Sequence, residues 1–448
     1  MDAALISRLQ FALTIAFHYI FPPLSIGLGL ILVVMEGLYL RTRLRLYEDM
    51  TRFWVKIFGL VFALGVASGI VMEFQFGTNW ATYSRFVGDV FGSALAAEGI
   101  FAFFLESGFL ALLLFGWNKV RPGVHFLSTV MVCLGAHFSA VWIIVANSWM
   151  QTPDGFHLVG EGLARRAEVT DFWAVVFNPS TLTRLAHTLV AAWQTGAFFV
   201  LSVSAYYLLK KRHEDFARVS MKIALVVALV ASLGSLVTGH RSGQIVARYQ
   251  PTKLAAMEGH FEALAPAGMH PFGWVKAEEG RVVGPRIPGL LSWLVYGDCR
   301  KPVQGLKAFP QKDWPPVNAT FQAFHVMVII GGALIVLVFA GLFLWRRGKL
   351  FTARWFLPFL VASVALPQIA NQVGWMAAEV GRQPWIVWGL MRTSDAVSPV
   401  VKAGDVLISI LLFGVIYVFL FALFIFLLDR KIKQGPVTDG EEGGGHRA

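Results

Sequence analysis

Long apolar runs separated by short polar clusters dominate the chain from residue 9 to residue 428. A helix that spans a lipid bilayer needs about 20 predominantly apolar residues. Nine segments meet this requirement, at residues 9–40, 53–76, 92–117, 124–149, 182–209, 219–239, 319–345, 355–379 and 403–428. The pattern predicts an all-α integral membrane protein with about nine transmembrane helices packed as a bundle, in a single membrane domain over residues 1–448.

Basic residues concentrate in alternate connections between these segments. The clusters lie at residues 41–52, 119–121, 210–218, 346–354 and 430–433, and the other short connections contain far fewer Lys and Arg. Short loops rich in Lys and Arg stay on the cytoplasmic side of a membrane. We therefore expect the C-terminus to be cytoplasmic and the N-terminus to lie outside.

One connection is much longer than the others. Residues 240–318 form a connection of about 80 residues between the sixth and seventh segments, and the alternation of sides places it outside. Loops of this length are usually functional or partly ordered. Residues 434–448 are polar and rich in glycine, so a disordered cytoplasmic tail is predicted there.

Composition narrows the chemistry. The chain has 448 residues, of which 56% are hydrophobic and 15% charged, and a formal net charge of +11. Because most of the excess Lys and Arg lies in clusters between the apolar segments, membrane topology explains the charge better than nucleic-acid binding does. The only cysteines are Cys133 and Cys299, and no C-x-x-C-H sequence is present. A disulfide framework, a Cys-rich zinc site, an iron–sulfur cluster and thioether-linked haem are therefore excluded.

Three side chains that can bind a metal lie inside apolar segments. His18 precedes Pro22 and Pro23, which are expected to kink the first helix. His187 lies near the start of the fifth segment, and Met327 near the start of the seventh. The alternative interpretations are histidines hydrogen-bonded inside the bundle and a methionine that only packs. A histidine and a methionine can instead complete a six-coordinate haem iron.

Polar residues in the third and fourth segments suit a proton path. Glu98 and Glu106 are eight residues apart, hence on roughly the same side of a helix, and Ser139 and Asn147 lie on the following segment. Carboxylates inside a membrane generally mark a proton or ion pathway. The alternatives are neutral glutamates bonded to a backbone carbonyl, and small polar residues that only pack helices together.

The stretch GWMAAEVGRQPW, residues 374–385, ends an apolar segment with charged residues. Glu379 and Arg382 lie between Trp375 and Trp385. A carboxylate at this place is costly unless something compensates its charge, so Glu379 needs a partner. From its position alone, Trp375 is more often a packing residue than one that lies between cofactors.

Several stretches together resemble subunit I of cytochrome bd-type quinol oxidases. They are MEFQFGTNW (72–80), EGIFAFFLES (98–107), SAVWIIVANSWMQ (139–151), AHTLVAAWQTGAFFVLSVSAYYLLK (186–210), TKLAAMEG (252–259) and GWMAAEVGRQPW (374–385). They follow the expected order across eight of the nine segments and the long connection. Its short loop makes the chain similar to the branch that includes cyanide-insensitive oxidases.

The resemblance implies three non-covalent haems. His187 and Met327 would hold a low-spin haem b. His18 and Glu379 would hold two high-spin haems, one of type b and the other of type d or b, and either residue could serve the iron that reduces oxygen. A haem iron would thus compensate the charge of Glu379.

The resemblance also implies roles around these haems. Arg382 would offset the charge of a haem propionate or steady the glutamate, and Trp375 would lie among the haems. The connection 240–318 corresponds to a quinol-binding loop, in which Lys253 would bind a quinone oxygen or balance negative charge and Glu258 would accept a proton.

Proton transfer inside the membrane is assigned in the same way. Glu98 and Glu106 correspond to carboxylates of a proton path towards the oxygen-reducing haem, and Ser139 would extend this path.

The sequence departs from the family pattern at one position beside a haem ligand, because His325 stands where the resemblance leads us to expect an arginine. The charge near the low-spin haem would then depend on pH.

The predicted function is a terminal quinol oxidase in a bacterial inner membrane. Ubiquinol or menaquinol would be oxidised at the outer face and dioxygen reduced to water, with protons taken from the cytoplasm so that a proton gradient forms. The expected partners are a membrane subunit II, a possible small third subunit and the lipid bilayer, without nucleic acid.

Two other functions are considered. A proton-coupled transporter would use the same intramembrane carboxylates, but the sequence contains no convincing internal repeat. An electron-transfer cytochrome would use only His187 and Met327, which leaves His18 and Glu379 without a role.

Overall fold

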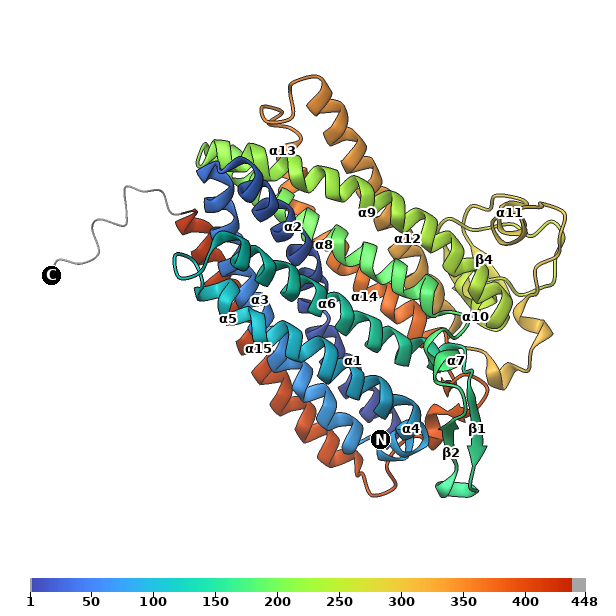
Figure 1. Cartoon of the computed structure of the whole chain (residues 1–448). Coiled ribbons are helices and arrows are strands. Elements are labelled where there is room, and N and C mark those ends of the chain that lie inside the picture. The colour runs from blue at the N-terminus through green and yellow to red at the C-terminus, as the bar shows by residue number, and fades with distance from the viewer. Residues whose placement is uncertain (1, 437–448) are drawn as a thin grey trace.

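The computed structural model describes residues 2–436 (Figure 1). The α-helices of this part are α1 (Ala3–His18), α2 (Phe21–Thr42), α3 (Arg45–Gly77), α4 (Ala81–Ala97), α5 (Phe104–Phe115), α6 (Pro122–Gln151), α7 (Phe172–Val176), α8 (Thr181–Lys210), α9 (Glu214–Tyr249), α10 (Pro251–Met257), α11 (Leu290–Tyr296), α12 (Val317–Arg346), α13 (Leu357–Ala362), α14 (Ala365–Val380) and α15 (Ala403–Gln434). Antiparallel hairpins pair β1 (Phe156–Val159) with β2 (Arg166–Val169), β3 (Trp274–Lys276) with β4 (Arg281–Val283), and β5 (Trp385–Val387) with β6 (Met391–Arg392).

Nine helical stretches in residues 2–436 are long and apolar enough to cross a membrane. They are α1 with α2, α3, α4 with α5, α6, α8, α9, α12, α13 with α14, and α15. Each overlaps one of the nine predicted segments. The prediction of a helical membrane protein is therefore confirmed.

The first stretch is interrupted where the two prolines predicted a kink. Helix α1 ends at His18, and α2 begins at Phe21 with Pro22 and Pro23 in its first turn. Proline is tolerated there because the first N–H groups of a helix have no partner inside it. The interruption leaves His18 as the last residue of α1.

The sixth helix corrects a predicted boundary. The connection was expected to begin at residue 240, but α9 continues to Tyr249. Polar residues such as His240, Arg241 and Gln244 end the apolar run without breaking the helix, since they can remain helical beyond the hydrocarbon layer. The helix ends immediately before Gln250 and Pro251.

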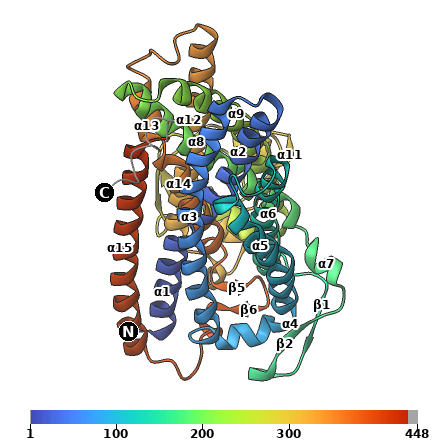
Figure 2. The same cartoon turned by 60° about the vertical axis from the view of Figure 1, so that its left-hand side comes forward.

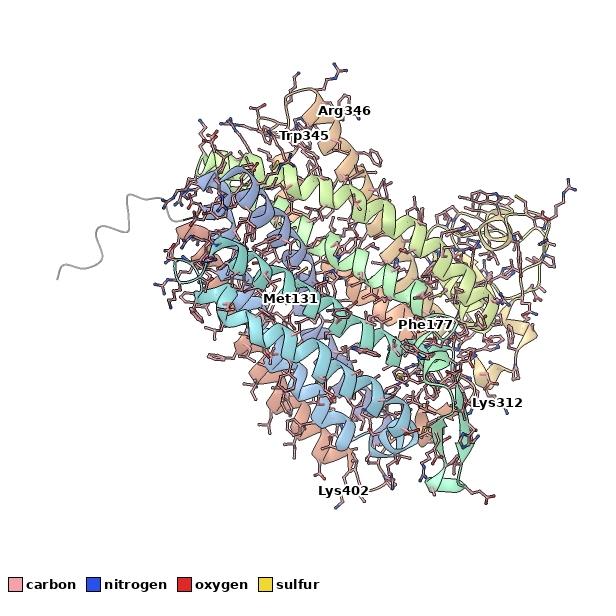
Figure 3. The ribbon with its side chains drawn as sticks, in the orientation of Figure 1. Met131, Phe177, Lys312, Trp345, Arg346 and Lys402 are labelled. Atoms are coloured by element: carbon pink, nitrogen blue, oxygen red, sulfur yellow. The ribbon has the colours of Figure 1, made fainter. Side chains whose placement is uncertain are left out.

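The two ends of the bundle carry alternate connections. Phe177, Lys312 and Lys402 lie at one end, Arg346 lies at the other, and Met131 lies between them (Figure 3). The N-terminus lies at the same end of the bundle as Lys402, and α15 leads the chain to the opposite end (Figures 1 and 3). This alternation agrees with the predicted topology, while the assignment of one end to the cytoplasm still rests on the basic clusters and stays a prediction.

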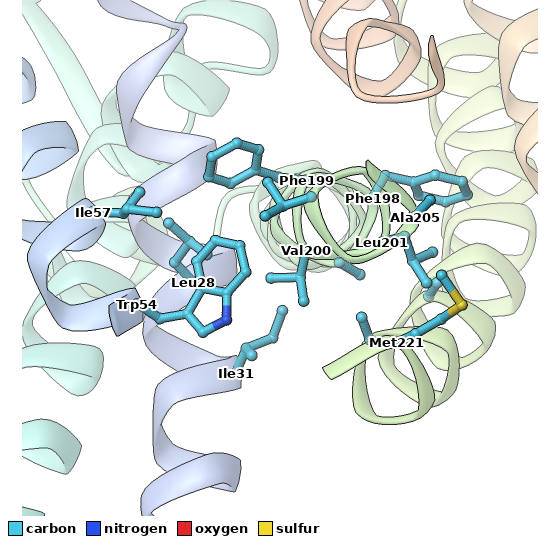
Figure 4. Close-up of a cluster of buried hydrophobic side chains, with 14 of the residues drawn as sticks. Leu28, Ile31, Trp54, Ile57, Phe198, Phe199, Val200, Leu201, Ala205 and Met221 are labelled. Carbon is cyan, nitrogen blue, oxygen red and sulfur yellow. The ribbon is translucent and has the colours of Figure 1, made fainter. Parts of the chain in front are cut away.

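Close packing of α2 against α8 forms the centre of the bundle. Leu28 and Ile31 of α2 lie beside Trp54 of α3 and the Phe198–Leu201 segment of α8 (Figure 4). Where the two helices cross, a Cβ atom at Gly27 would lie 2.3 Å from the Ala192 carbonyl oxygen, and one at Gly196 would lie 2.4 Å from the Gly27 carbonyl carbon. Small residues at both positions let the backbones touch.

Helix α15 lies at an edge of the bundle, where it packs against α1 and α3 (Figures 1 and 2).

The long connection lies at the same end of the bundle as the N-terminus and contains α10, α11 and the β3–β4 hairpin. Helix α10 packs between α9 and α12, so this connection is ordered against the bundle. Of the predicted tail, residues 437–448 lie outside the described residues.

Candidate functional site

His18 is held in one tautomer by α3. Its Nδ1 lies 3.0 Å from the Ser68 hydroxyl oxygen, and that hydroxyl donates its own hydrogen to the Leu64 carbonyl at 2.7 Å. Because the single hydroxyl hydrogen is already used, Ser68 accepts from His18 Nδ1–H. The lone pair of the imidazole then lies on Nε2, for which the described residues provide no hydrogen bond.

His187 has the same arrangement on α9. Its Nδ1 donates to the Thr238 hydroxyl at 2.9 Å, and Thr238 donates to the Gly234 carbonyl at 2.7 Å. Histidines that bind metals almost always donate their second N–H to such a partner, which fixes both tautomer and ring orientation. Both histidines therefore present an available Nε2, as a haem ligand must.

A glycine follows each hydroxyl residue and leaves space for the ring. A Cβ atom at Gly69 would lie 3.3 Å from His18 Cε1, and one at Gly239 would lie 3.4 Å from His187 Cε1. Neither hydroxyl partner was predicted from the sequence. The sequence signal for these hydroxyl partners was a Ser-Gly pair and a Thr-Gly pair inside apolar segments.

Met327 lies on α12 with its sulfur against α14. A Cβ atom at Gly374 would lie 2.7 Å from the Met327 sulfur, so glycine is required for this contact. Helix α9 packs against both α8 and α12, and thereby brings the helices of His187 and Met327 to the same side of the bundle.

His325 is buried and stacks on Phe321, and its Nδ1 lies 2.9 Å from the Phe321 carbonyl oxygen. Since a carbonyl oxygen only accepts, His325 Nδ1 carries a hydrogen.

Glu379 lies in a cluster of hydrogen-bond donors. Its Oε1 accepts from the Asn147 side chain at 3.1 Å and from the Gln151 side chain at 3.2 Å, and its Oε2 forms an ion pair with Arg382. Arg184 of α8 binds the Asn147 side-chain oxygen from the other side. The carboxylate is thus compensated by protein groups even without a metal.

Arg382 contacts Glu379 and has two further buried donors. It steadies Glu379 directly through one terminal nitrogen. Its Nε and Nη1 atoms are buried without a hydrogen-bond partner in the described part of the chain. Buried guanidinium donors without partners are costly, so these two fit an anionic group such as a propionate. Trp375 lies half-buried one turn before Glu379.

Two members of this cluster were missed in the sequence. Gln151 ends the quoted stretch SAVWIIVANSWMQ, and Arg184 lies three residues before His187. An arginine near the start of an apolar helix was the available signal for Arg184. Asn147, one of the polar residues that suited a proton path in the sequence, lies with Glu379 and Arg184.

Lys253 is buried, although it lies on a helix of the long connection. It is only 1% exposed. Its Nζ donates to the Ala378 carbonyl at 2.8 Å and to the Gln151 and Gln250 side-chain oxygens at 2.9 and 3.4 Å. Burial lowers the pKa of Lys253 well below its usual value, and the Glu379 carboxylate opposes this shift.

Glu258 is also buried, but in contrasting surroundings. It is 4% exposed, and its Oε2 has no hydrogen-bond partner among the described residues. Burial raises the pKa of Glu258 to about 8. A carboxyl group with such a pKa can take up and release a proton near neutral pH.

The candidate proton path is partly assembled. Ser139 of α6 donates to Glu98 Oε1 at 2.6 Å. Glu98 begins a π-helical turn, Glu98–Phe103, between α4 and α5, and such turns are frequent at functional sites. Glu106 is buried against α6, where a Cβ atom at Gly135 would lie 2.8 Å from the Glu106 Cβ.

Comparison with known proteins gives a consistent result. A family model described as cytochrome bd terminal oxidase subunit I matches residues 6–436. The chain belongs to this family. The resemblance inferred from the motifs is therefore confirmed, and with it a haem-containing oxidoreductase of respiratory electron transport.

Individual relatives match over almost their whole length. Cytochrome bd ubiquinol oxidase subunit 1 of Bacillus subtilis (strain 168) is 42% identical over 450 residues, which are 98% of this chain and 95% of that protein. Cytochrome bd-II ubiquinol oxidase subunit 1 of Escherichia coli (strain K12) is 36% identical over 502 residues, with 97% of both chains covered. The bd oxidase structure from Geobacillus thermodenitrificans matches with a TM-score of 0.90 and 31% identity, over 97% of this chain and 99% of that one.

The residues of this bd oxidase subunit fit haem. Two histidines have their Nε2 atoms available, and buried donors of Arg382 have no protein partner beside Glu379 among the described residues. The ligand assignments themselves remain predictions.

Proposed function

We propose that this chain is the subunit of a bd-type terminal oxidase that oxidises quinol and reduces dioxygen to water. The observation that supports this most is the matched pair of histidines, each fixed as the Nδ1–H tautomer by a hydroxyl group on a neighbouring helix. Together with Glu379 they offer ligands for more than one haem. This number favours an oxidase over an electron-transfer cytochrome with a single haem.

The proposal assigns three non-covalent haems. His187 and Met327 hold a low-spin haem b, and His18 and Glu379 hold two high-spin haems, one b and the other d or b. When bound, these groups would supply electron transfer and the binding of dioxygen at iron. Arg382 binds a propionate through its unpartnered nitrogens while it steadies Glu379.

Glu258 accepts a proton from quinol in this proposal. Oxidation of a quinol releases two electrons and two protons, so a carboxylate within reach of a quinol hydroxyl is needed. Glu258 lies on the long connection, and its pKa of about 8 provides a usable fraction of the base at neutral pH. The quinol is ubiquinol or menaquinol, and the site lies at the outer face.

Protons for water formation travel through Glu106, Glu98 and Ser139. Reduction of one dioxygen to two water molecules consumes four protons, which a buried site must import through polar side chains. The hydrogen bond between Ser139 and Glu98 supports one step of this path. Because these protons come from the cytoplasm and quinol protons leave outside, the reaction generates a proton gradient.

The proposed setting is a bacterial inner membrane with a second membrane subunit and a possible small third one. Large apolar side chains of α15 face outward, among them Leu411, Leu412, Val415 and Val418. Such a surface needs lipid or another apolar helix against it.

A reduced-minus-oxidised optical spectrum of the purified oxidase tests the function. We expect one low-spin and additional high-spin haem signals. A spectrum without haem bands would favour the transporter, and a single low-spin haem would favour the electron-transfer cytochrome.

A further inference from the structure

The helix that carries His18 is interrupted immediately after this residue, and the interruption removes a backbone hydrogen bond. In a continuous helix, the Ala16 carbonyl would accept from the Ile20 N–H group, four residues further on. That N–H group instead donates to the Phe17 carbonyl at 3.4 Å. A backbone carbonyl without a donor is costly inside a membrane, so the Ala16 carbonyl needs a donor from another element.

Helix α14 supplies donors on both sides of the interruption. The Gln372 side chain donates to the Ala16 carbonyl at 2.8 Å, and the Gln368 side chain donates to the Ile20 carbonyl at 3.1 Å. Ala16 lies two residues before His18, and Ile20 lies two residues after it. Gln368 and Gln372 are themselves about one turn apart on α14. They therefore form two successive hydrogen bonds that bracket His18 along its backbone.

His18 is thus held both at its ring and at its backbone. The hydroxyl of Ser68 accepts from the ring at Nδ1, while the two glutamines donate to the backbone on either side of the residue. The bond to Ser68 fixes the tautomer and the rotation of the ring. The position of the ring along the bundle also depends on the backbone of His18, which is the last residue of α1. The glutamine side chains fix this backbone where the helix itself no longer does.

The same helix carries a second candidate haem ligand. Glu379 lies seven residues after Gln372 on α14, which is close to two helical turns, so the two side chains lie on the same side of the helix. The bonds of Gln368 and Gln372 therefore connect the helix of Glu379 directly to the backbone beside His18.

We propose that Gln368 and Gln372 are positioning residues for His18, and that they set its place relative to Glu379. Gln372 replaces the hydrogen bond that the interruption removes, and Gln368 adds a second one a turn away. Together they fix the histidine nitrogen assigned to the iron of a high-spin haem. This inference rests on the proposed function, because it concerns the ligand of that haem.

The test substitutes each glutamine in the complete oxidase. Methionine has a similar unbranched shape and no N–H donor. We expect Gln372→Met to change the optical spectrum of the His18 haem and to weaken its retention during purification about 3–10-fold, which corresponds to the loss of one hydrogen bond. Ser68→Ala identifies the signal of this haem, because Ser68 holds the His18 ring. An unchanged His18 haem in Gln372→Met overturns the proposal.

Gln368→Met keeps the test valid if Gln372→Met does not fold. Gln368 Oε1 is buried without a hydrogen-bond partner in the described part of the chain, so this substitution also removes an unpaired acceptor and should cost little stability. We expect a smaller change of the same haem, since the bond to Ile20 is the longer of the two. A loss of thermal stability with unchanged high-spin spectra in either variant would make the glutamines ordinary packing residues and overturn the proposal.

Asn371→Leu is the matched control on the same helix. Asn371 is the neighbour of Gln372, but its amide donates to the Thr195 hydroxyl of α8 at 2.9 Å and not to the backbone beside His18. We expect the His18 haem to be unchanged in this variant. If Asn371→Leu changes that haem as much as Gln372→Met does, the effect comes from the general placement of α14, and the proposal is overturned.

The low-spin haem provides an internal control. The Met327 sulfur lies against Gly374 of α14, so a general shift of this helix would also reach the haem assigned to His187 and Met327. We expect its spectrum to stay the same in both glutamine variants, and an equal change in both kinds of haem would overturn the proposal. Absence of haem from the unmodified oxidase would contradict the proposed function itself, and this inference with it.

Discussion

Glu379 and Glu258 are two largely buried carboxyl groups near the end of the bundle that contains α10, and their surroundings are opposite. Glu379 accepts from Asn147 and Gln151 and forms an ion pair with Arg382. Glu258 has an oxygen without any partner in the described residues, and burial alone raises its pKa to about 8. The surroundings of Glu379 thus favour an ionised carboxylate, and those of Glu258 favour a carboxyl group that exchanges a proton.

These surroundings suit the two residues to different tasks. A metal ligand must remain ionised, and nearby cations favour the ionised carboxylate. A proton acceptor must change state near the working pH, and burial without cations moves a carboxyl group into that range. Four experiments test this difference, and their expected effects decrease from the loss of a haem to a small change in stability.

Glu379→Gln should remove or severely disturb one high-spin haem. A neutral amide is a poor iron ligand, and the variant also loses the charge that pairs with Arg382. Haem stoichiometry and the carbon monoxide difference spectrum measure the effect, with the low-spin haem as an internal control. A full haem complement with normal ligand binding, together with unchanged or higher thermal stability, would identify Glu379 as an ordinary buried acid.

Glu258→Gln should slow quinol oxidation by about 10²-fold or more, the usual contribution of a general base. Oxygen consumption driven by an artificial donor that bypasses the quinol site should change far less, and haem content should stay intact. The unmodified oxidase should gain quinol activity as pH rises towards about 8, where the Glu258 carboxylate becomes the major form. Equal losses with both donors would contradict a role at the quinol site.

Thr238→Val and Ser68→Ala should weaken single haems without abolishing them. Each removes the hydroxyl that accepts from a histidine Nδ1–H and leaves the histidine in place. Loss of such a partner typically lowers metal affinity about 10–100-fold. We expect Thr238→Val to affect only the low-spin haem and Ser68→Ala only a high-spin haem, as measured by haem retention during purification. If each variant affects both haems alike, the two histidines do not bind separate groups.

The smallest effect is a pH-dependent change in stability from Glu258. Its folded pKa of about 8 lies above the ordinary value for glutamate, so the folded state binds the extra proton between these limits. Folding stability contributed by this group is therefore present at low pH, falls as pH rises through this window and is constant above it. Glu258→Gln, which mimics the neutral form, should be more stable than the unmodified protein at a pH of about 8.5, with a smaller difference at a pH of about 6.

Thermal unfolding at these two pH values measures the difference. Lys253→Met offers a contrast, because it removes a group that holds three buried hydrogen bonds and should destabilise the protein at both pH values. An equal gain for Glu258→Gln at the lower and the higher pH would show that burial does not raise the pKa of Glu258.

The sequence by itself determined the nine membrane helices and the interruption after His18. These features depend on the length of apolar runs and on Pro22 and Pro23, which are local properties of the chain. The sequence assigned Ser139 and Glu98 to one proton path, but only the structure shows the hydrogen bond between them. The end of α9 was misplaced because polar residues mark the edge of the hydrocarbon layer and not the end of a helix.

Only the tertiary structure decided how Glu379 is compensated and which groups Lys253 contacts. Gln151 binds Lys253 from 102 positions away and Glu379 from 228 positions away, and no periodicity relates such distances. The histidine tautomers depend on Ser68 and Thr238, which lie on other helices than the rings they bind. Hydrogen bonds of this kind form between helices that meet only after the bundle has packed, so the physical state of each buried charged group is a property of the assembled fold.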